Sequence, residues 1–530
     1  MAYGDRRGTT CSAPTIAAVT GIGGSPQQID RLRSDLLHSH YDVDTLADVL
    51  GELATAAMAR EQVLPAIRTA RSSDDPAAVL VRLFILGDDV TVAEATGALP
   101  ELGVEGAAGL GLLSAAGTAP EDRVTARVDL RPVDTSGGGF WLAADLGEAT
   151  TGTAVGAEHV LGLGGASRTL AELTVRTPVG RALDLGTGSG IQALNLAGFA
   201  QSVVGTDISA AALSYAAFNA ALNDCAVDLR RGSMLEPVAG EQFDLVVSNP
   251  PFVITPRGTE DSAQALETYT YRDGGRRGDD LVRDLITGVG AVLAPGGIAQ
   301  FLANWEVHRG EGAFDRVQQW LAESGLDGWV IQREHADPAE YAETWLRDGG
   351  ITPDRDADAW RRGYTAWLDD FEARGVDAVG FGYVTLHKPL RPAALPWHRC
   401  EEITGTLSPT LWPTIAATLA AKDRLAHLGD ELLADQRLRV AGDVTEERHY
   451  TPGQMDPQVI VLRQGGGLGR TVRAGTALAA VVGASDGELT VGQIASGVAV
   501  LTDTRPADVL ADVLPDVRGL ILDGLLLLPE

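Results

Sequence analysis

The chain has 530 residues, which is too many for one ordinary hydrophobic core and suggests about three domains. Its 45% hydrophobic and 22% charged residues are typical of a globular protein, and no window of about 18 apolar residues could cross a bilayer. A formal charge of -30 repels phosphate backbones, so a nucleic-acid site would need a local basic patch.

The first residues and the cysteines predict the compartment. Residues 1–7 are polar and no apolar signal segment follows them. The cysteines Cys11, Cys225 and Cys400 lie far apart in the sequence, which argues against a disulfide framework. We therefore expect a cytoplasmic protein. The pair His398 and Cys400 favours a surface turn over a metal site, so we predict no metal.

The N-terminal third is predicted to be helical. Residues 1–28 are rich in small residues and are expected to form a flexible start, and a winged-helix-like domain is expected over residues 29–150. Its layout is short helices over 92–99 and 104–113, then a hairpin from 124–130 through Gly137–Gly139 to 140–142. A winged helix can bind nucleic acid, but residues 104–113 contain neither Arg nor Lys, so we favour a packing or lid role.

From about residue 170 to 390, strand-like and helix-like segments alternate, which indicates a parallel sheet with crossover helices. Strands are expected at 182–185, 202–206, 227–230, 243–248, 298–303, 329–332 and 378–386, and helices at 209–222, 279–293 and 314–321. These segments define a domain over residues 151–392. The remainder, residues 393–530, is predicted to be an acidic α+β accessory domain for structure or partner docking.

A glycine-rich turn follows the first strand. Gly186, Gly188 and Gly190 alternate with Thr187 and Ser189, and glycine lets backbone approach a ligand closely. Nicotinamide dinucleotide sites prefer the spacing GxGxxG, so GxGxG alone is a weak signal. Glycines at 162–165, ahead of Ser167, also suggest backbone close to a cofactor or a tight turn.

Two carboxylates strengthen the signal. Asp207 ends the second strand about 20 residues after the glycines, where a carboxylate can bind ribose hydroxyls, and Ile208 could lie on an adenine face. Asp184 could order the loop or meet a cationic amino acid. Turn capping is the alternative role for both carboxylates.

The most informative motif is Asn249-Pro250-Pro251-Phe252, which follows the buried strand predicted at 243–248. Amide and exocyclic amine nitrogens are poor nucleophiles because their lone pair is delocalised. The Asn249 side-chain oxygen and the Pro250 carbonyl can both accept hydrogen bonds from one such NH2 group. The prolines stiffen the strand exit, and Phe252 can stack on a planar substrate. A structural turn is the alternative.

Residues 184–190, Asp207 and residues 249–252 together resemble the class I S-adenosylmethionine-dependent methyltransferases of the amino-methylating group. The resemblance covers about residues 175–310. It implies an α/β fold with a seven-stranded, mostly parallel Rossmann-like sheet and a terminal antiparallel strand. It also implies S-adenosyl-L-methionine as cofactor, with Asp207 at the ribose and Ser233 and Met234 beside the adenine. Asn249, Pro250 and Phe252 would then be the catalytic residues.

The resemblance leaves the substrate open, because the group includes ribosomal-RNA and adenine amino-methyltransferases and release-factor glutamine methyltransferases. Phe252 favours a nucleobase amine in RNA or DNA, since the glutamine enzymes usually carry Tyr there. The acidic charge favours a glutamine amide on a protein. We expect a macromolecular substrate and favour RNA over protein. A small metabolite and a non-catalytic binding scaffold are further alternatives.

Side chains after the motif offer a second test of the substrate class. Tyr269, Tyr271, Arg272, Arg276 and Arg277 could form a clamp for phosphate and base, or a solvated loop neutralised by nearby aspartates. Asn304 and Trp305, with His308 nearby, should end a strand on the cofactor side of the sheet. For Trp305 we favour packing at the rim over base stacking.

Overall fold

The computed structural model describes residues 21–60, 62–135, 138–152, 155–257, 272–391, 395–405 and 411–529. Residues 1–20 of the expected flexible start lie outside this part of the chain, as do Gly137, Tyr269 and Tyr271. Within the described ranges, no helix combines the length and the apolar character needed to cross a membrane.

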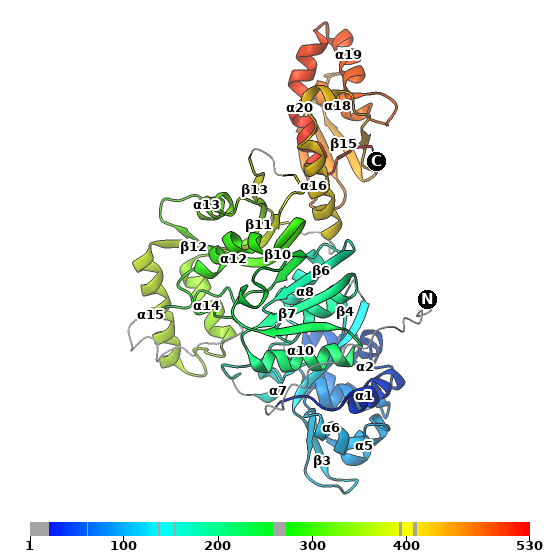
Figure 1. Cartoon of the computed structure of the whole chain (residues 1–530), viewed down its shortest axis with the longest axis vertical. Helices are drawn as coiled ribbons and strands as arrows, with labels where there is room; N and C mark the ends of the chain where they lie inside the picture. Colours follow the sequence, from blue (N-terminus) through cyan, green and yellow to red (C-terminus); the bar gives the residue numbers. More distant parts are fainter. Residues whose placement is uncertain are drawn as a thin grey trace.

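A mixed sheet lies at the centre of the molecule (Figure 1). Within the described residues it has eight strands in the order β13-β11-β12-β10-β9-β6-β7-β8. Their bounds are β6 Val179–Leu185, β7 Ala200–Asp207, β8 Val227–Arg231, β9 Phe243–Ser248, β10 Leu293–His308, β11 Asp327–Ala336, β12 Val376–His387 and β13 His398–Glu402. The run from β8 to β10 is parallel, and β12 is antiparallel to both of its neighbours.

The expected seven strands are all present, and β13 is an additional edge strand parallel to β11. Its residues include His398 and Cys400, for which a surface turn was predicted, so that prediction was wrong. The segment HRCEE has no apolar alternation that would indicate a strand. It is held by contacts with a distant part of the chain, such as the bond from Trp329 Nε1 to Glu401 Oε1 (2.7 Å).

Helices cover both faces of the central sheet. Their bounds are α8 Gly165–Leu173, α9 Ile191–Ala197, α10 Ala210–Leu222, α12 Asp280–Gly288, α13 Asp315–Ser324 and α16 Trp412–Leu425. Along β9, Val246 packs into the cluster shared with α12 and α13, whereas Leu245 and Val247 pack into the cluster shared with α8, α9 and α16. This alternation explains why β9 appears in the sequence as a continuous apolar run.

Two predicted helices differ in outcome. The helix expected at 209–222 is confirmed as α10, with the Ser209 side chain accepting from Ala212 N (3.2 Å). The helix expected at 279–293 ends earlier, at Gly288, and a short 3-10 turn, η3 (Val289–Ala291), follows it. The turn expected at 295–297 is instead an irregularity inside β10, where the pairing with β9 shifts between Leu293 and Ile298.

The N-terminal region combines helices with two small sheets. Its elements are α1 Pro26–His38, α2 Val43–Met58, α3 Leu64–Ala70, α4 Pro76–Leu80, η1 Val81–Ile85, β1 Val90–Thr91, α5 Val92–Ala98, α6 Gly103–Gly109, β2 Leu113–Ala115, β3 Arg123–Ala126, β4 Val128–Thr135 and β5 Gly138–Asp145. The hairpin expected from 124 to 142 is present as the antiparallel pair β4 and β5, but the bounds expected for its first strand were wrong. Its first strand is divided between β3, which pairs with β1 and β2, and β4, which pairs with β5.

The N-terminal region packs onto α10. Two asparagines one turn apart on this helix bind the backbone of β5 as a neighbouring strand would. Asn219 accepts from Ala143 N and donates to Ala143 O (2.8 Å each), and Asn223 does the same at Trp141 N (2.9 Å) and O (2.7 Å). Tyr215 and Phe218 of α10 share one buried cluster with the N-terminal helices. The helix that follows Asp207 is therefore fixed on its outer side.

The C-terminal region lies at the opposite end of the molecule (Figure 1). After α16 it contains α17 Asp430–Ala434, β14 Arg439–Val440, β15 Val444–His449, β16 Val459–Gln464, β17 Thr471–Ala474, α18 Thr476–Gly483, α19 Val491–Thr502, α20 Pro506–Leu522 and β18 Leu526–Leu527. These elements bury a cluster of their own around Leu433, Val481 and Val517.

Candidate active site

The glycine-rich turn joins β6 to α9 at the carboxyl edge of the sheet. Gly186, Gly188 and Gly190 all have positive φ angles, of 73°, 54° and 90°. A Cβ atom at Gly186 or Gly188 would meet no atom within 4 Å, whereas one at Gly190 would lie 3.2 Å from Ala216 Cα. The first two glycines therefore face open space that a ligand could enter, and the third is required for packing against α10.

Asp184 orders this turn from beneath. Its buried carboxylate accepts from Thr187 Oγ1 (2.6 Å) and from Ala193 N (2.9 Å) at the start of α9. Burial raises the pKa of Asp184 to about 7, the charge of Asp207 adds to this effect, and the two hydrogen bonds oppose it. These contacts order the loop, which is one of the roles that the sequence suggested for Asp184; the other was to meet a cationic amino acid.

Asp207 lies at the end of β7, next to the same turn. It accepts from Gly188 N (2.9 Å) and Ser209 N (2.8 Å), which connects the turn to the start of α10. Burial raises the pKa of Asp207, and bonds from backbone N–H groups oppose this shift. The neighbouring Ile208 is 56% exposed.

Ser233 and Met234 follow β8, the next strand outward from β7. Met234 has a φ of 47°, which is uncommon for a residue with a side chain, and it is partly buried against the cluster that contains Val246. Both residues thus lie at the same edge of the sheet as Asp207, two strands away from the glycine-rich turn.

The motif Asn249–Phe252 leaves the sheet at the end of β9. Asn249 Nδ2 donates to Ser167 Oγ over a long 3.5 Å, so its Oδ1 faces away from that partner as an acceptor. The Pro250 carbonyl accepts from Phe252 N (2.8 Å), which closes a tight turn and occupies one of its two lone pairs. Phe252 is partly buried against the clusters on both faces of the sheet, so only part of its ring can meet a substrate.

The segment that follows the motif pairs with residues 272–274. Val253 N donates to Arg272 O (2.9 Å) and Gly274 N donates to Pro251 O (3.1 Å). Asp273, between the two paired residues, forms an ion pair with Arg257. The described residues on both sides of 258–271 are therefore tied together directly beside the motif.

Arg272 and Arg276, two of the three arginines singled out after the motif, lie beside carboxylates. Arg272 binds Asp348 (2.7 Å), and Arg276 lies 3.7 Å from Asp284. Trp305 is fully buried, and its Nε1 donates to Ala313 O (3.0 Å), so it packs in the core and not at the rim as predicted. These contacts favour the neutralised loop over the arginine clamp among the described residues.

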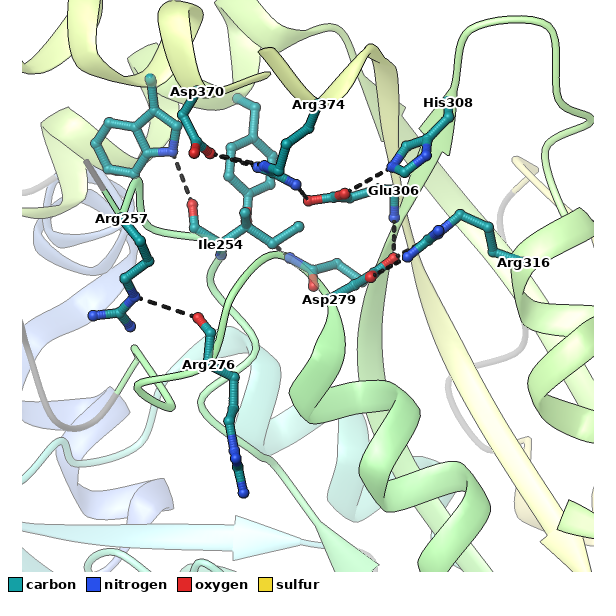
Figure 2. A network of polar contacts seen from close by, with 12 residues as sticks. Ile254, Arg257, Arg276, Asp279, Glu306, His308, Arg316, Asp370 and Arg374 are labelled. Carbon is teal, nitrogen blue, oxygen red and sulfur yellow. Dashed lines mark hydrogen bonds and ion pairs between the residues drawn. The ribbon is translucent and has the colours of Figure 1, made fainter. Parts of the chain in front are cut away.

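A charged network continues from the end of β10 (Figure 2). Glu306 is 2% exposed at its side chain, pairs with Arg374 and contacts His308 Nε2 (2.9 Å). Asp279 accepts from Glu306 N (2.9 Å) and binds Arg316 (2.6 Å). β10 runs on to His308, so Asn304 and Trp305 lie within this strand and not at its end as predicted.

A small cavity lies beside the motif at this edge of the sheet, lined by residues such as Pro251, Phe252 and Gly274. A larger cavity, of about 550 Å³, is lined by residues such as Gly290, Leu326 and Leu390, at the amino ends of β10 and β11. The glycine-rich turn lies at the opposite, carboxyl edge, which is where open α/β sheets bind ligands. The candidate site lies where the carboxyl ends of β7, β6 and β9 meet.

Sequence reasoning missed several side chains that hold the motif. Ser167 was noted only as the end of a glycine-rich segment, and the contact with Asn249 explains why this segment passes close to the site. Tyr341 and Trp367, which bind the backbone of Ile254, had no local signal, because they lie about 90 residues or more further along the chain.

Comparison with known proteins was consistent with this geometry. Residues 162–268 match the family Methyltransferase small domain, and residues 38–127 match Domain of unknown function (DUF7059). The Release factor glutamine methyltransferase of Deinococcus radiodurans is 42% identical over 120 residues, which are 22% of this chain and 43% of that protein. The Ribosomal RNA small subunit methyltransferase C of Erwinia tasmaniensis is 33% identical over 145 residues, 26% of this chain and 41% of that protein.

These matches are partial: the chain spans less than half the length of either relative. Among solved structures, a methyltransferase from Pyrococcus furiosus aligns with 42% of this chain and 80% of its own, with 16% identity and a TM-score of 0.25. That score is too low to carry a structural conclusion.

Proposed function

We propose that this chain, which carries a methyltransferase small domain of the class that uses S-adenosyl-L-methionine, methylates a planar amino nitrogen. One observation carries the proposal. Leu185 pairs with Thr206 on one side and with Ser248 on the other, so β7, β6 and β9 end side by side. The ribose carboxylate, the glycine-rich turn and the acceptor motif therefore emerge next to one another in that order.

The chemistry follows from this order. Asp207 is proposed to bind the ribose, with Ile208, Ser233 and Met234 around the adenine. A cofactor held there would supply an electrophilic methyl group, and at the neighbouring strand end Asn249 Oδ1 and the Pro250 carbonyl would accept hydrogen bonds from one NH2 group. Two fixed acceptors orient the nitrogen lone pair toward the methyl group, so catalysis is largely positioning. No strong base is needed, because the alkylated nitrogen loses its proton easily.

A glutamine amide on a protein is the substrate we now favour. The charge of -30 and the pairing of Arg257, Arg272 and Arg276 with aspartates leave little support for binding a phosphate backbone. A relative with 42% identity is named for a glutamine substrate. These observations support the glutamine amide, against the preference for RNA that Phe252 suggested.

A nucleobase amine in RNA is the second candidate. It is supported by Phe252 at the fourth motif position and by the relative named for ribosomal RNA. A winged-helix-like N-terminal domain could contribute to such binding, although α6 contains neither Arg nor Lys.

The deciding experiment is incubation of the full chain with methyl-labelled S-adenosylmethionine and with separated protein, RNA and DNA fractions of the host. Label in a protein, recovered as methylglutamine after digestion, is the expected result. Label in RNA would select the second candidate. No label in any fraction, together with no heat of cofactor binding in calorimetry, would overturn the enzyme proposal.

The variant Asn249→Ala tests the proposed acceptor. We expect methyl transfer to fall at least about a hundredfold, because one of the two oxygens that orient the nitrogen is lost. Cofactor affinity, measured by calorimetry, should stay within about twofold of the wild type, since Asn249 is assigned to the acceptor side. An equal loss of cofactor binding would show that Asn249 is a cofactor ligand and not the acceptor group.

A further inference from the structure

The connection between β11 and β12 is larger than the sheet requires. These strands are antiparallel neighbours, which a hairpin of two residues can join. Here the connection contains two helices, α14 (Pro338–Asp348) and α15 (Ala357–Arg374), with a buried cluster of their own. Ile254, two residues beyond the catalytic motif, is a member of that cluster. The two helices are thus packed against the exit of the motif.

Both backbone polar groups of Ile254 are bound by side chains of these helices. Ile254 N donates to Tyr341 Oη (2.9 Å) on α14, and Ile254 O accepts from Trp367 Nε1 (2.8 Å) on α15. A buried backbone segment normally obtains such bonds from a neighbouring strand. At this position the side chains take the place of a strand.

The hydroxyl of Tyr341 is itself fixed. Asn304 Nδ2, on β10, donates to Tyr341 Oη (2.8 Å), and both side chains are completely buried. The ring of Tyr341 packs edge-on against Phe371 and is stacked on Phe381, with centroid separations of 5.6 Å. The phenol is therefore held in one position, and its hydrogen bond to Ile254 N holds the backbone of Ile254 in place.

The position of Ile254 matters because the motif is stiff. At the near end, Ser248 Oγ donates to Leu185 O (2.7 Å), which ties the end of β9 to β6. Between Ser248 and Ile254, Pro250 and Pro251 have restricted φ angles and the Pro250 carbonyl is closed into a turn with Phe252 N. A chain that is fixed at both ends and stiff between them keeps its carbonyl directions.

We propose that Tyr341 is a positioning residue for methyl transfer, whose hydroxyl fixes Ile254 and thereby aims the oxygens of Asn249 and Pro250 at the acceptor nitrogen. This inference rests on the proposed function. Tyr341 acts through the backbone of the motif and does not touch the substrate.

The variant Tyr341→Phe removes the hydroxyl and keeps the packed ring. With the labelled cofactor and the host fraction that accepts label, we expect kcat to fall roughly tenfold while the KM for that fraction stays within about twofold. Calorimetry should show an unchanged affinity for S-adenosylmethionine. Because unfolded enzyme would also lower the apparent kcat at an unchanged KM, kcat is calculated per cofactor-binding site as counted by the calorimetry.

The matched control is Tyr41→Phe. Tyr41 is also buried and its hydroxyl donates to a backbone carbonyl, that of Leu130 (2.8 Å), but within the N-terminal region. We expect the two variants to lose similar stability in thermal unfolding, and only Tyr341→Phe to lose kcat. Equal kcat values for the two variants would overturn the positioning role.

Hydrogen–deuterium exchange separates this inference from the proposed function. The amide of Ile254 loses its acceptor in Tyr341→Phe, so peptides covering residues 249–256 should exchange at least about tenfold faster than in wild type or Tyr41→Phe. This comparison needs no substrate. Unchanged exchange would overturn the inference even in an active enzyme, whereas an inactive wild type with the expected exchange would overturn only the methyltransferase proposal.

Discussion

At the scale of single residues, two opposing effects act on the pKa of each carboxylate beside the glycine-rich turn. Asp184 and Asp207 bind N–H and O–H groups that order the turn, which favours ionisation. Burial has the larger effect and raises the pKa of both. The same arrangement that shapes a cofactor loop therefore makes the folded protein sensitive to pH near neutrality.

This sensitivity has a definite sign for Asp184. Its pKa is about 7 in the folded protein against an ordinary value of 3.8, so the folded state binds the proton more tightly than the unfolded state. The stabilising contribution is complete below pH 3.8 and is lost as the pH rises to about 7. We expect Asp184→Asn, which cannot ionise, to gain stability relative to wild type across this window.

Urea unfolding of both proteins at several pH values measures the effect. The difference in the free energy of unfolding should change by at most about 1.4 kcal/mol per pH unit, the limit for one proton. A difference that stays constant from pH 4 to pH 7 would contradict the raised pKa of Asp184.

Site residues that directly follow or end a strand could be predicted from the sequence. Residues that reach the site from distant segments of the chain could not. Gly186, Asp207 and Asn249 follow strands directly, so the strand pattern was enough to bring them to one edge. Ser167 contacts the motif, and Tyr341 and Trp367 contact Ile254 just beyond it, only because helices from other parts of the chain pack there. Their side chains have no signal in the sequence that distinguishes them from ordinary core residues.

At the scale of secondary-structure elements, α10 performs two tasks. Its N-terminus follows Asp207, and its outer face binds β5 through Asn219 and Asn223. Asn219 is completely buried and also donates to Ser189 O (2.8 Å), so one side chain connects the glycine-rich turn, α10 and the N-terminal hairpin.

We expect Asn219→Ala to destabilise the protein by about 3 kcal/mol, because it leaves the N–H of Ala143 and two carbonyl groups without their partner in a buried place. Asn223→Ala, at a half-buried position, should cost less than half as much. Chemical denaturation of the two variants measures the order. If Asn223→Ala were the more damaging change, the role given to Asn219 would be wrong.

Elements with regular apolar patterns were predicted well. The parallel strands β6 to β9 and helix α10 follow from apolar runs and capping residues in the sequence. The elements that differ depend on pairing between distant segments: β13 joins β11, and β3 and β4 join different sheets although only Arg127 separates them. A short stretch of sequence does not determine which strand a segment pairs with or in which register, because many strands could pair with the same sheet edge.

At the scale of the whole molecule, a buried ion pair connects the central sheet to the C-terminal region. Lys422 on α16 contacts Asp327 at the start of β11, and His387 lies 3.6 Å from the same carboxylate. Burial alone would raise the pKa of Asp327, but the hydrogen bonds from Lys422 and Trp397 N and the nearby His387 outweigh it and hold the pKa below 3.8.

We expect Lys422→Met to destabilise the protein by about 3 kcal/mol at pH 7, since it leaves the Asp327 carboxylate buried without its cation. A carboxylate with a lowered pKa stabilises the fold above pH 3.8, and this contribution is lost as the pH falls through the lower folded value. The difference between variant and wild type in urea unfolding should therefore shrink in acid.

The control is Lys388→Met, which changes the only other lysine of the chain. Lys388 Nζ donates to the carbonyls of Gly290 (3.0 Å) and Leu293 (2.8 Å). Its loss should cost stability by an amount that does not depend on the titration of Asp327. A similar pH dependence for both variants would show that the pair with Asp327 is not the cause.

The order of strands in the sheet sets an order of events during synthesis. β12 lies between β10 and β11 but is made after both, and β13 closes the edge of β11 later still. A nascent chain that has emerged only to residue 336 therefore presents two unfilled strand edges, at which other chains can add. Ribosomes that pause between residues 336 and 402 should expose this protein to aggregation, and a chaperone that shields strand edges would be needed most over that interval.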